Sequence, residues 1–229
     1  MRAVSSRIEC VARVRRTRGF WVVASFRQIA IALALATFLT PLAQSSASPQ
    51  SLHEQFLSRL LAAAHERTSH TVRYDPAYVR IAYPNGDVPA DTGVCTDEII
   101  RIYRALGIDL QRLVHEDMQQ NRAAYPRFGN YNDTDTNIDH RRVPNLMVFF
   151  ARKGKSQPIT NRIEDYSPGD LVTWDLGGNV PHIGILVDTK SPQSGRYMIV
   201  HNIGRGPKME DVLFDWKITG HYSYGGANP

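Results

Sequence analysis

The chain has 229 residues, of which 42% are apolar and 21% are charged, with 27 Lys and Arg against 22 Asp and Glu. This length allows one sizeable domain or two small ones, and the composition argues against wholesale disorder or a fibrous architecture. The net charge of +5 is unevenly distributed: residues 1–47 hold seven arginines and one acid, Glu9, which leaves the other 182 residues near −1. We therefore expect no nucleic-acid partner for the main part of the chain.

The N-terminal region has the order of a secretory signal. The basic stretch runs into an apolar segment of eleven residues, 29–39, which is followed by the small residues 45–47. Eleven residues are too few to cross a bilayer. An uncleaved anchor extended back to Phe20 would place Arg27 inside the membrane, which is costly. We expect residues 1–47 to be removed on export, which gives a periplasmic or extracellular protein without a stable membrane anchor.

Helical spacing of apolar residues predicts a lead-in helix over Ser51 to His65, within residues 48–70, that packs on a single domain formed by residues 71–229. A second apolar stripe is followed by Gly107 and predicts a helix whose first turn contains Cys95.

Further along the chain, a helix is expected over residues 110–124, whereas the apolar run 144–151 does not distinguish helix from strand. From residue 170 onward the apolar residues occur in short runs separated by Gly, Pro, Asn or Ser. Four strands are expected there: 170–176, 181–188, 196–202 and 211–217. Helices first and a meander of strands afterwards indicate an α+β fold.

Cys95 is the cysteine expected to remain in the mature protein. Removal of the signal also removes Cys10, so the mature chain has one cysteine. A lone thiol in an oxidising compartment is a small buried residue, an intermolecular link or a reactive group. At the start of a helix, unpaired backbone N–H groups and the helix dipole favour the thiolate and can lower the pKa of the thiol.

Two histidines fall on neighbouring predicted strands. If these strands form a hairpin with its turn at Ser191-Pro192, His182 lies directly opposite His201, with Cβ atoms about 4.5–5.5 Å apart. One imidazole could then hydrogen-bond to the other. Either histidine alone would be interpreted as a polar residue near a sheet edge, but together with Cys95 they supply a nucleophile, a base and a group that orients the base.

These residues lie in motifs that resemble a known class of enzyme. The segments Asp170-Leu-Val-Thr-Trp174, His182-Ile-Gly-Ile185 and Ile199-Val-His201 resemble the GD-L-V-F, H-V-G-I and F-I-H run of NlpC-type cell-wall peptidases. Gly93-Val-Cys-Thr-Asp97 resembles a variant of the helix start that bears their cysteine, although the usual Asp-Cys-Ser-Gly is here Val-Cys-Thr-Asp.

A closer resemblance covers roughly residues 55 to 225. Tyr83-Pro-Asn-Gly-Asp-Val88, Asn137-Ile-Asp-His-Arg-Arg-Val-Pro-Asn-Leu146 and Trp216-Lys-Ile-Thr-Gly-His-Tyr222 are similar to the secreted bacterial family labelled domain of unknown function 1287. That family brings no established activity with it.

The NlpC-like part implies a papain-like α+β fold, with N-terminal helices packed on an antiparallel β-meander. It implies a cysteine amidase or endopeptidase that acts on peptidoglycan peptides, with Cys95 as nucleophile, His182 as base and His201 as the orienting residue. On this resemblance we expect no metal or other cofactor, and a monomer.

Four further residues are candidates for substrate binding: Asp97, His140, Arg141 and Arg142. Paired arginines bind carboxylates of the kind abundant in wall peptides, so Arg141 and Arg142 could bind such a substrate. The alternative is that residues 139–142 form a solvated loop whose charged side chains pair with one another. Asp97 could instead cap the helix that begins at Cys95.

Two other functions compete with the cysteine hydrolase. One is a zinc hydrolase that uses three histidines and an aspartate, from His140, His182, His201 and one of Asp139 or Asp170, although no HExxH spacing supports it. The other is a non-catalytic wall-binding module with the same fold.

Overall fold

A computed structural model describes residues 48–128 and 133–226, so the predicted signal segment, residues 1–47, lies outside the described residues. Within the described ranges, every helix is too short or too polar to cross a membrane.

The helices come mainly from the first half of the described chain. Four are α-helices: α1 (Pro49–Arg67), α2 (Cys95–Ala105), α3 (Leu110–Gln120) and α4 (Val143–Lys153). Three single turns of 3₁₀-helix cover Arg122–Ala124, Asp139–Arg141 and Ile163–Asp165. The lead-in helix and the helix at Cys95 are therefore where the sequence predicts them, and the apolar run 144–151 is helical.

Within the described residues, eight strands form two sheets, and most of these strands follow the helices. They are β1 (Arg73–Tyr74), β2 (Thr92–Gly93), β3 (Lys155–Ser156), β4 (Leu171–Asp175), β5 (Pro181–Lys190), β6 (Tyr197–His201), β7 (Lys208–Glu210) and β8 (Lys217–Ser223). β1 and β2 pair in parallel, and the other six form one antiparallel sheet in the order β3-β8-β4-β5-β6-β7. The predicted α+β class is confirmed.

Local sequence explains where the helices begin. The Ser48 hydroxyl accepts a hydrogen bond from the Ser51 amide at the start of α1, and the Asp109 carboxylate accepts one from Arg112 at the start of α3. The cap of α2 is different, because Val94 offers no side-chain acceptor. There the Asp97 carboxylate reaches back to the Val94 amide at 2.7 Å, so the helix start beside Cys95 is held by a residue of its own first turn.

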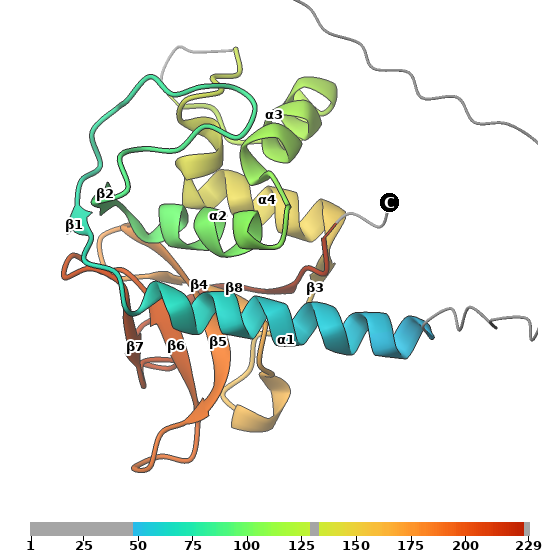
Figure 1. Ribbon diagram of the computed structural model, residues 1–229, viewed down its shortest axis with the longest axis vertical. Helices are drawn as coiled ribbons and strands as arrows, with labels where there is room; N and C mark the ends of the chain where they lie inside the picture. Colours follow the sequence, from blue (N-terminus) through green and yellow to red (C-terminus); the bar gives the residue numbers. More distant parts are fainter. Residues whose placement is uncertain (1–47, 129–132, 227–229) are drawn as a thin grey trace, which may run out of the picture. The chain divides into compact units, whose positions relative to one another are not determined.

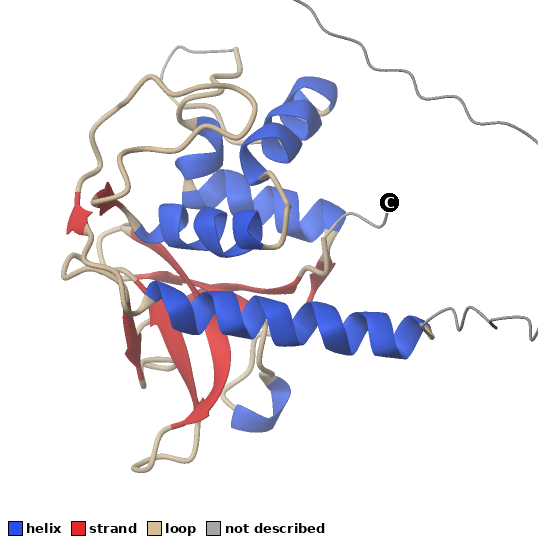
Figure 2. Ribbon diagram, viewed as in Figure 1, coloured by secondary structure: helices blue, strands red, loops and turns tan. Residues whose placement is uncertain are grey.

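The six-stranded sheet has an apolar cluster on each face. Helices α2, α3 and α4 gather on one side of the sheet, and α1 runs alongside it (Figure 1). On the helix side, Ile99 and Leu146 pack with Ile183 and Val200 of the sheet, and Cys95 belongs to this cluster. The strands of the six-stranded sheet form a twisted layer beneath α2, α3 and α4 (Figure 2).

The second cluster lies on the opposite face of the sheet. It contains Trp174 of β4, Leu186 of β5, Ile199 of β6 and Leu213, which comes from the turn between β7 and β8. The indole of Trp174 donates to the Leu213 carbonyl at 2.9 Å. His182 pairs with Trp174 in the β4–β5 ladder and so lies on this second face.

The fourth predicted strand, 211–217, is wrong. Residues 211–216 form a turn, and the strands on either side of it are β7 and β8. The turn is rich in apolar residues because Leu213 is buried against the second face of the sheet, so its apolar content does not reflect strand pairing. The expected meander continues only to β7, since β8 returns to pair between β3 and β4.

The register predicted for the β5–β6 hairpin is also wrong, by two residues. Ile185 pairs with Val200 and Leu186 with Ile199, after which the register shifts toward the turn. Continued toward the start of β5, this register places Gly184, not His182, opposite His201. A Cβ atom added at Gly184 would lie 3.2 Å from the His201 Cβ, in agreement with that placement. A shift of two keeps both histidines on one face, because side chains alternate with a period of two.

Candidate active site

The two predicted histidines lie next to each other. His182 Nε2 is 2.8 Å from His201 Nδ1, and the two rings meet edge to face with centroids 5.0 Å apart. The contact is diagonal across β5 and β6, and the missing side chain of Gly184 leaves the space that the two rings need. Both imidazoles are buried.

Two tryptophans surround this histidine pair. The Trp174 ring lies 5.9 Å from the His182 ring, and the Trp216 ring lies 6.3 Å from His182 and 6.4 Å from His201. The rings exclude water from the pair. Burial accordingly lowers the pKa of His182 to about 3, with a smaller contribution from His201, and burial also lowers the pKa of His201. Both imidazoles are therefore neutral at pH 7.

A third residue continues the chain of hydrogen bonds. The carboxylate of Glu210, on β7, is 2.9 Å from His201 Nε2. This contact opposes the effect of burial and raises the pKa of His201 relative to burial alone. Glu210 was not among the predicted site residues, because the strand that carries it was expected at 211–217. A strand placed at 208–210 would have put Glu210 on the same face as His201.

Cys95 lies on the helix side of the sheet, whereas the two imidazoles lie on its opposite face. It is the first residue of α2, and the backbone N–H groups of Ile183 and Thr96 lie close enough to its sulfur to favour the thiolate. The Ile183 nitrogen is bonded to the carbonyl carbon of His182, so the thiol lies beside the backbone that carries the predicted base. No hydrogen bond joins the Cys95 thiol to an imidazole in the described part of the chain.

The expectation that the helix start lowers the pKa of Cys95 is wrong for this structure. Burial raises the pKa of the thiol to about 12, and the neighbouring N–H groups offset only part of that effect. Cys95 as a whole residue is only 5% exposed. Desolvation disfavours the charged thiolate more than the helix start favours it. At rest the thiol and both imidazoles are therefore neutral.

Tyr74 is another residue near the thiol that sequence reasoning missed. Burial raises the pKa of its hydroxyl to about 12, with smaller contributions from the ionised forms of Cys95 and Asp97. Tyr74 lies on β1, which pairs with β2 directly before the turn that leads to Cys95. A lone tyrosine on a two-residue strand carries no pattern by which the sequence could have indicated it.

Two of the predicted substrate-binding residues bind each other. Arg141 donates to both oxygens of Asp97 at 2.8 and 3.0 Å, and to the Ala77 carbonyl at 3.2 Å. Both charged side chains are buried. Since Asp97 also accepts the Val94 amide, these contacts fix the start of α2, and so the position of Cys95, to the segment around Ala77.

The other two candidates have different surroundings. His140 is buried, its Nδ1 atom has no hydrogen-bond partner, and burial lowers the pKa of the ring to about 3. Arg142 is partly exposed, contacts Asp139 at 3.4 Å and places its guanidinium 4.3 Å from the centre of the Phe128 ring. The His140, Arg141 and Arg142 side chains therefore do not act as one polar loop.

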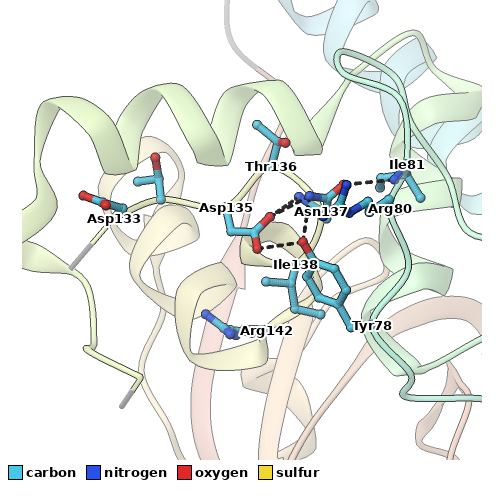
Figure 3. Close-up of a pocket in the computed structure, with 10 residues that line it drawn as sticks. Tyr78, Arg80, Ile81, Asp133, Asp135, Thr136, Asn137, Ile138 and Arg142 are labelled. Carbon is cyan, nitrogen blue, oxygen red and sulfur yellow. Dashed lines mark hydrogen bonds between the residues drawn. The ribbon is translucent and has the colours of Figure 1, made fainter. Parts of the chain in front are cut away.

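Arg142 lines a cavity of about 850 Å³ in the region of the predicted arginine clamp. In Figure 3 the Tyr78 hydroxyl and the Asn137 amide turn toward the Asp135 carboxylate, while Arg142 enters from the opposite side. Arg80 also lines this cavity. The cavity therefore offers both cationic and anionic groups, but none of Cys95, His182 and His201 lines it.

Of the residues of the alternative zinc site, His182 and His201 are neighbours, but the set as a whole does not come together. Among residues 48–128 and 133–226, no group of three or more His, Cys, Asp or Glu side chains is placed to hold a metal ion.

Comparison with known proteins places the chain in a family. The family described as "Domain of unknown function (DUF1287)" matches residues 61–224. The chain belongs to this family. It is also 47% identical to "Uncharacterized protein YijF" of Escherichia coli K12 over 161 residues, which are 70% of this chain and 78% of that relative. The family predicted from the sequence motifs is thereby confirmed.

A solved structure described as "Structure of NlpC1 from Trichomonas vaginalis" matches 73% of this chain at 14% identity and a TM-score of 0.38. The chain spans 44% of the length of that structure. The region matched by the DUF1287 family contains the whole candidate site, from Tyr74 and Cys95 to Glu210.

Proposed function

We propose that this protein is an exported cysteine hydrolase that cleaves amide bonds in the peptides of peptidoglycan. The observation that carries the proposal is the 2.8 Å hydrogen bond between His182 Nε2 and His201 Nδ1. This bond engages the far nitrogen of His182 and leaves Nδ1, the nitrogen nearer the backbone, without a partner among the described residues. The Cys95 thiol lies beside that same backbone.

In the proposed reaction, His182 Nδ1 takes the thiol proton as the sulfur attacks the amide carbonyl carbon. The thiol and imidazole are both neutral at rest, so we assign proton transfer and attack to one concerted step. The Cys95 backbone N–H, the first of α2, would donate to the oxyanion. The imidazolium then protonates the leaving amine, and a water molecule hydrolyses the thioester with His182 as base.

His201 would hold the His182 ring and stabilise its charged form, as expected of the third member of a catalytic triad. The cavity beside Arg142 is a candidate subsite, because its cations and anions suit peptides that carry both carboxylates and amines.

A second candidate function is a wall-binding module without turnover. The burial of Cys95 and the absence of a thiol–imidazole hydrogen bond among the described residues favour it. The two candidates differ in whether the protein releases soluble fragments from the wall.

The test is to incubate the purified protein with peptidoglycan sacculi, with and without EDTA, and to measure soluble muropeptides. The parallel variants are Cys95→Ser, His182→Asn and, as a matched control, His53→Asn, which changes an exposed histidine of α1. Release that survives EDTA, persists in His53→Asn and vanishes in the first two variants is the expected result. Release by folded Cys95→Ser contradicts the proposal. Cosedimentation with sacculi and no release by the unmodified protein would establish the wall-binding module instead.

A further inference from the structure

We propose that Glu210 is a positioning residue of this site, whose carboxylate fixes the order of protons along His201 and His182. The inference rests on the proposed function for its catalytic consequence. Its structural part, the direction of the hydrogen bonds, can be measured whether or not the protein is an enzyme.

The geometry joins three neighbouring strands on one face of the sheet. In the β6–β7 ladder His201 pairs with Lys208, and Glu210 pairs with Ile199. Glu210 therefore reaches His201 diagonally, as His182 does from the other side. The two contacts, of 2.8 and 2.9 Å, engage both nitrogens of the His201 ring. His201 itself has no exposed side-chain surface, whereas the Glu210 side chain is 46% exposed.

The carboxylate determines which atoms carry hydrogen. An ionised carboxylate only accepts hydrogen bonds, so His201 Nε2 must donate to Glu210. In a neutral imidazole the other nitrogen then accepts, so His201 Nδ1 must accept from His182 Nε2. His182 is left with its lone pair on Nδ1, which is the form of the ring that can take a proton from Cys95.

Without the carboxylate the opposite order is equally compatible with the contact between the two rings. His201 Nδ1 would donate to His182 Nε2, and the proton of His182 would lie on Nδ1. That tautomer cannot act as the base, because its Nε2 is engaged by His201 and its Nδ1 is already protonated. Glu210 thus selects the productive tautomer, and it also places negative charge at the far end of the pair when His182 becomes an imidazolium.

The competing explanation is that Glu210 forms an exposed ion pair on an edge strand and contributes little. The variants Glu210→Leu and Glu210→Gln distinguish these readings. Leu removes every acceptor, while Gln keeps the shape and can both accept and donate, so it should weaken the tautomer preference without abolishing it. Glu164→Leu is the matched control, since it removes an exposed glutamate elsewhere, paired only with Arg162 at 3.7 Å.

The direct measurement is the ¹⁵N spectrum of the histidine rings in the full chain at pH 7, assigned with His182→Gln and His201→Gln. We expect His182 and His201 to be protonated on Nε2, to become tautomer mixtures in Glu210→Leu, and to remain unchanged in Glu164→Leu. Rings that keep the Nε2–H form in folded Glu210→Leu would overturn the proposal. Should Glu210→Leu fail to fold, Glu210→Gln gives the same test with a smaller shift.

The catalytic part is read from turnover of peptidoglycan. Glu210→Leu should lower kcat about tenfold or more at unchanged KM, and Glu210→Gln should recover part of the loss. A tautomer shift with unchanged kcat would overturn the positioning role. If the unmodified protein has no turnover, the proposed function fails, and the spectrum alone decides whether Glu210 orders the protons.

Discussion

Arg141 and Asp97 are joined by two parallel hydrogen bonds, of 2.8 and 3.0 Å, although they are 44 positions apart in the chain. Both side chains are buried, and Asp97 also caps α2 through the Val94 amide. The ion pair therefore connects the start of the helix that bears Cys95 to the 3₁₀ turn that precedes α4. Such a pair matters most when one partner is lost, because the remaining charge is then buried alone.

We predict that Arg141→Met lowers the free energy of unfolding by about 3–5 kcal/mol, measured by urea denaturation. The double variant Arg141→Met with Asp97→Asn should be more stable than the single variant, since an amide is cheaper to bury than an unpaired carboxylate and its oxygen still accepts the Val94 amide. Equal stability of the single and double variants would show that the loss does not come from the orphaned charge.

Gly184 should be sensitive to the smallest substitution. A Cβ atom at this position would lie 2.6 Å from Cγ2 of Ile199 and 3.2 Å from both the His201 Cβ and the Val200 carbonyl. We predict that Gly184→Ala costs about 1–3 kcal/mol of stability and disturbs the His182–His201 bond, because β5 and β6 must separate. Gly225→Ala is the control, since nothing lies within 4 Å of its Cβ position. Equal unfolding midpoints for the two variants would contradict the packing at Gly184.

The Cys95 thiol should react slowly with alkylating reagents in the folded protein. Its pKa of about 12 lies three units above the ordinary value of 9.0, so the thiolate population near neutral pH is lower by about a thousandfold. We predict a rate with iodoacetamide that keeps rising above pH 10 and that increases sharply in denaturing urea. Mass spectrometry of the peptide that contains Cys95 separates this rate from that of Cys10. A rate that levels off below pH 9 would mean that the thiol is far more acidic than its burial implies.

Stability should fall as the pH is lowered from about 6.5. The folded-state pKa values of His140 and His182 are about 3, below the ordinary value of 6.5, so the unfolded state binds more protons over this window. Each such histidine lowers the free energy of unfolding by about 1.4 kcal/mol for every pH unit below 6.5. This loss ends as the pH approaches 3, where the histidine is also protonated in the folded state. We predict that His140→Phe makes the slope shallower by one proton between pH 6 and 4, while His53→Phe, at an exposed site, leaves it unchanged. Parallel slopes for all three proteins would show that His140 is not buried in its neutral form.

Much of the fold could be predicted from local sequence patterns. The features that could not be predicted depend on pairing between segments that are distant in the sequence. The helices at Ser51 and Cys95 could be predicted because their apolar residues repeat at helical spacing. The pairing of β8 between β3 and β4 could not be predicted, because the alternation of apolar and polar residues within a strand does not indicate which strands pair with it. The β5–β6 register failed because the turn is centred later in the chain than Ser191-Pro192: Lys190 pairs with Tyr197 beside the turn, and the register shifts once more before Leu186 pairs with Ile199.

The candidate site likewise has a part that local patterns predict and a part that they do not. His182 and His201 could be placed on one face from alternation alone, and their contact survived a register error of two residues. Glu210 and Tyr74 were missed because their relevance depends on strands of two or three residues. The pKa of Cys95 was misjudged because helix position is local, whereas burial is a property of the whole fold.

The position of β8 determines when the six-stranded sheet can form during synthesis of the chain. Lys217–Ser223 is made last of all the strands, yet it lies inside the sheet, with β3 and β4 on either side. Until those residues leave the ribosome, β4 has an open edge and β3 has no partner. A growing chain therefore cannot close this sheet until residues 217–223 have been made, and a chain cut short before residue 217 would expose the edge that β8 normally covers.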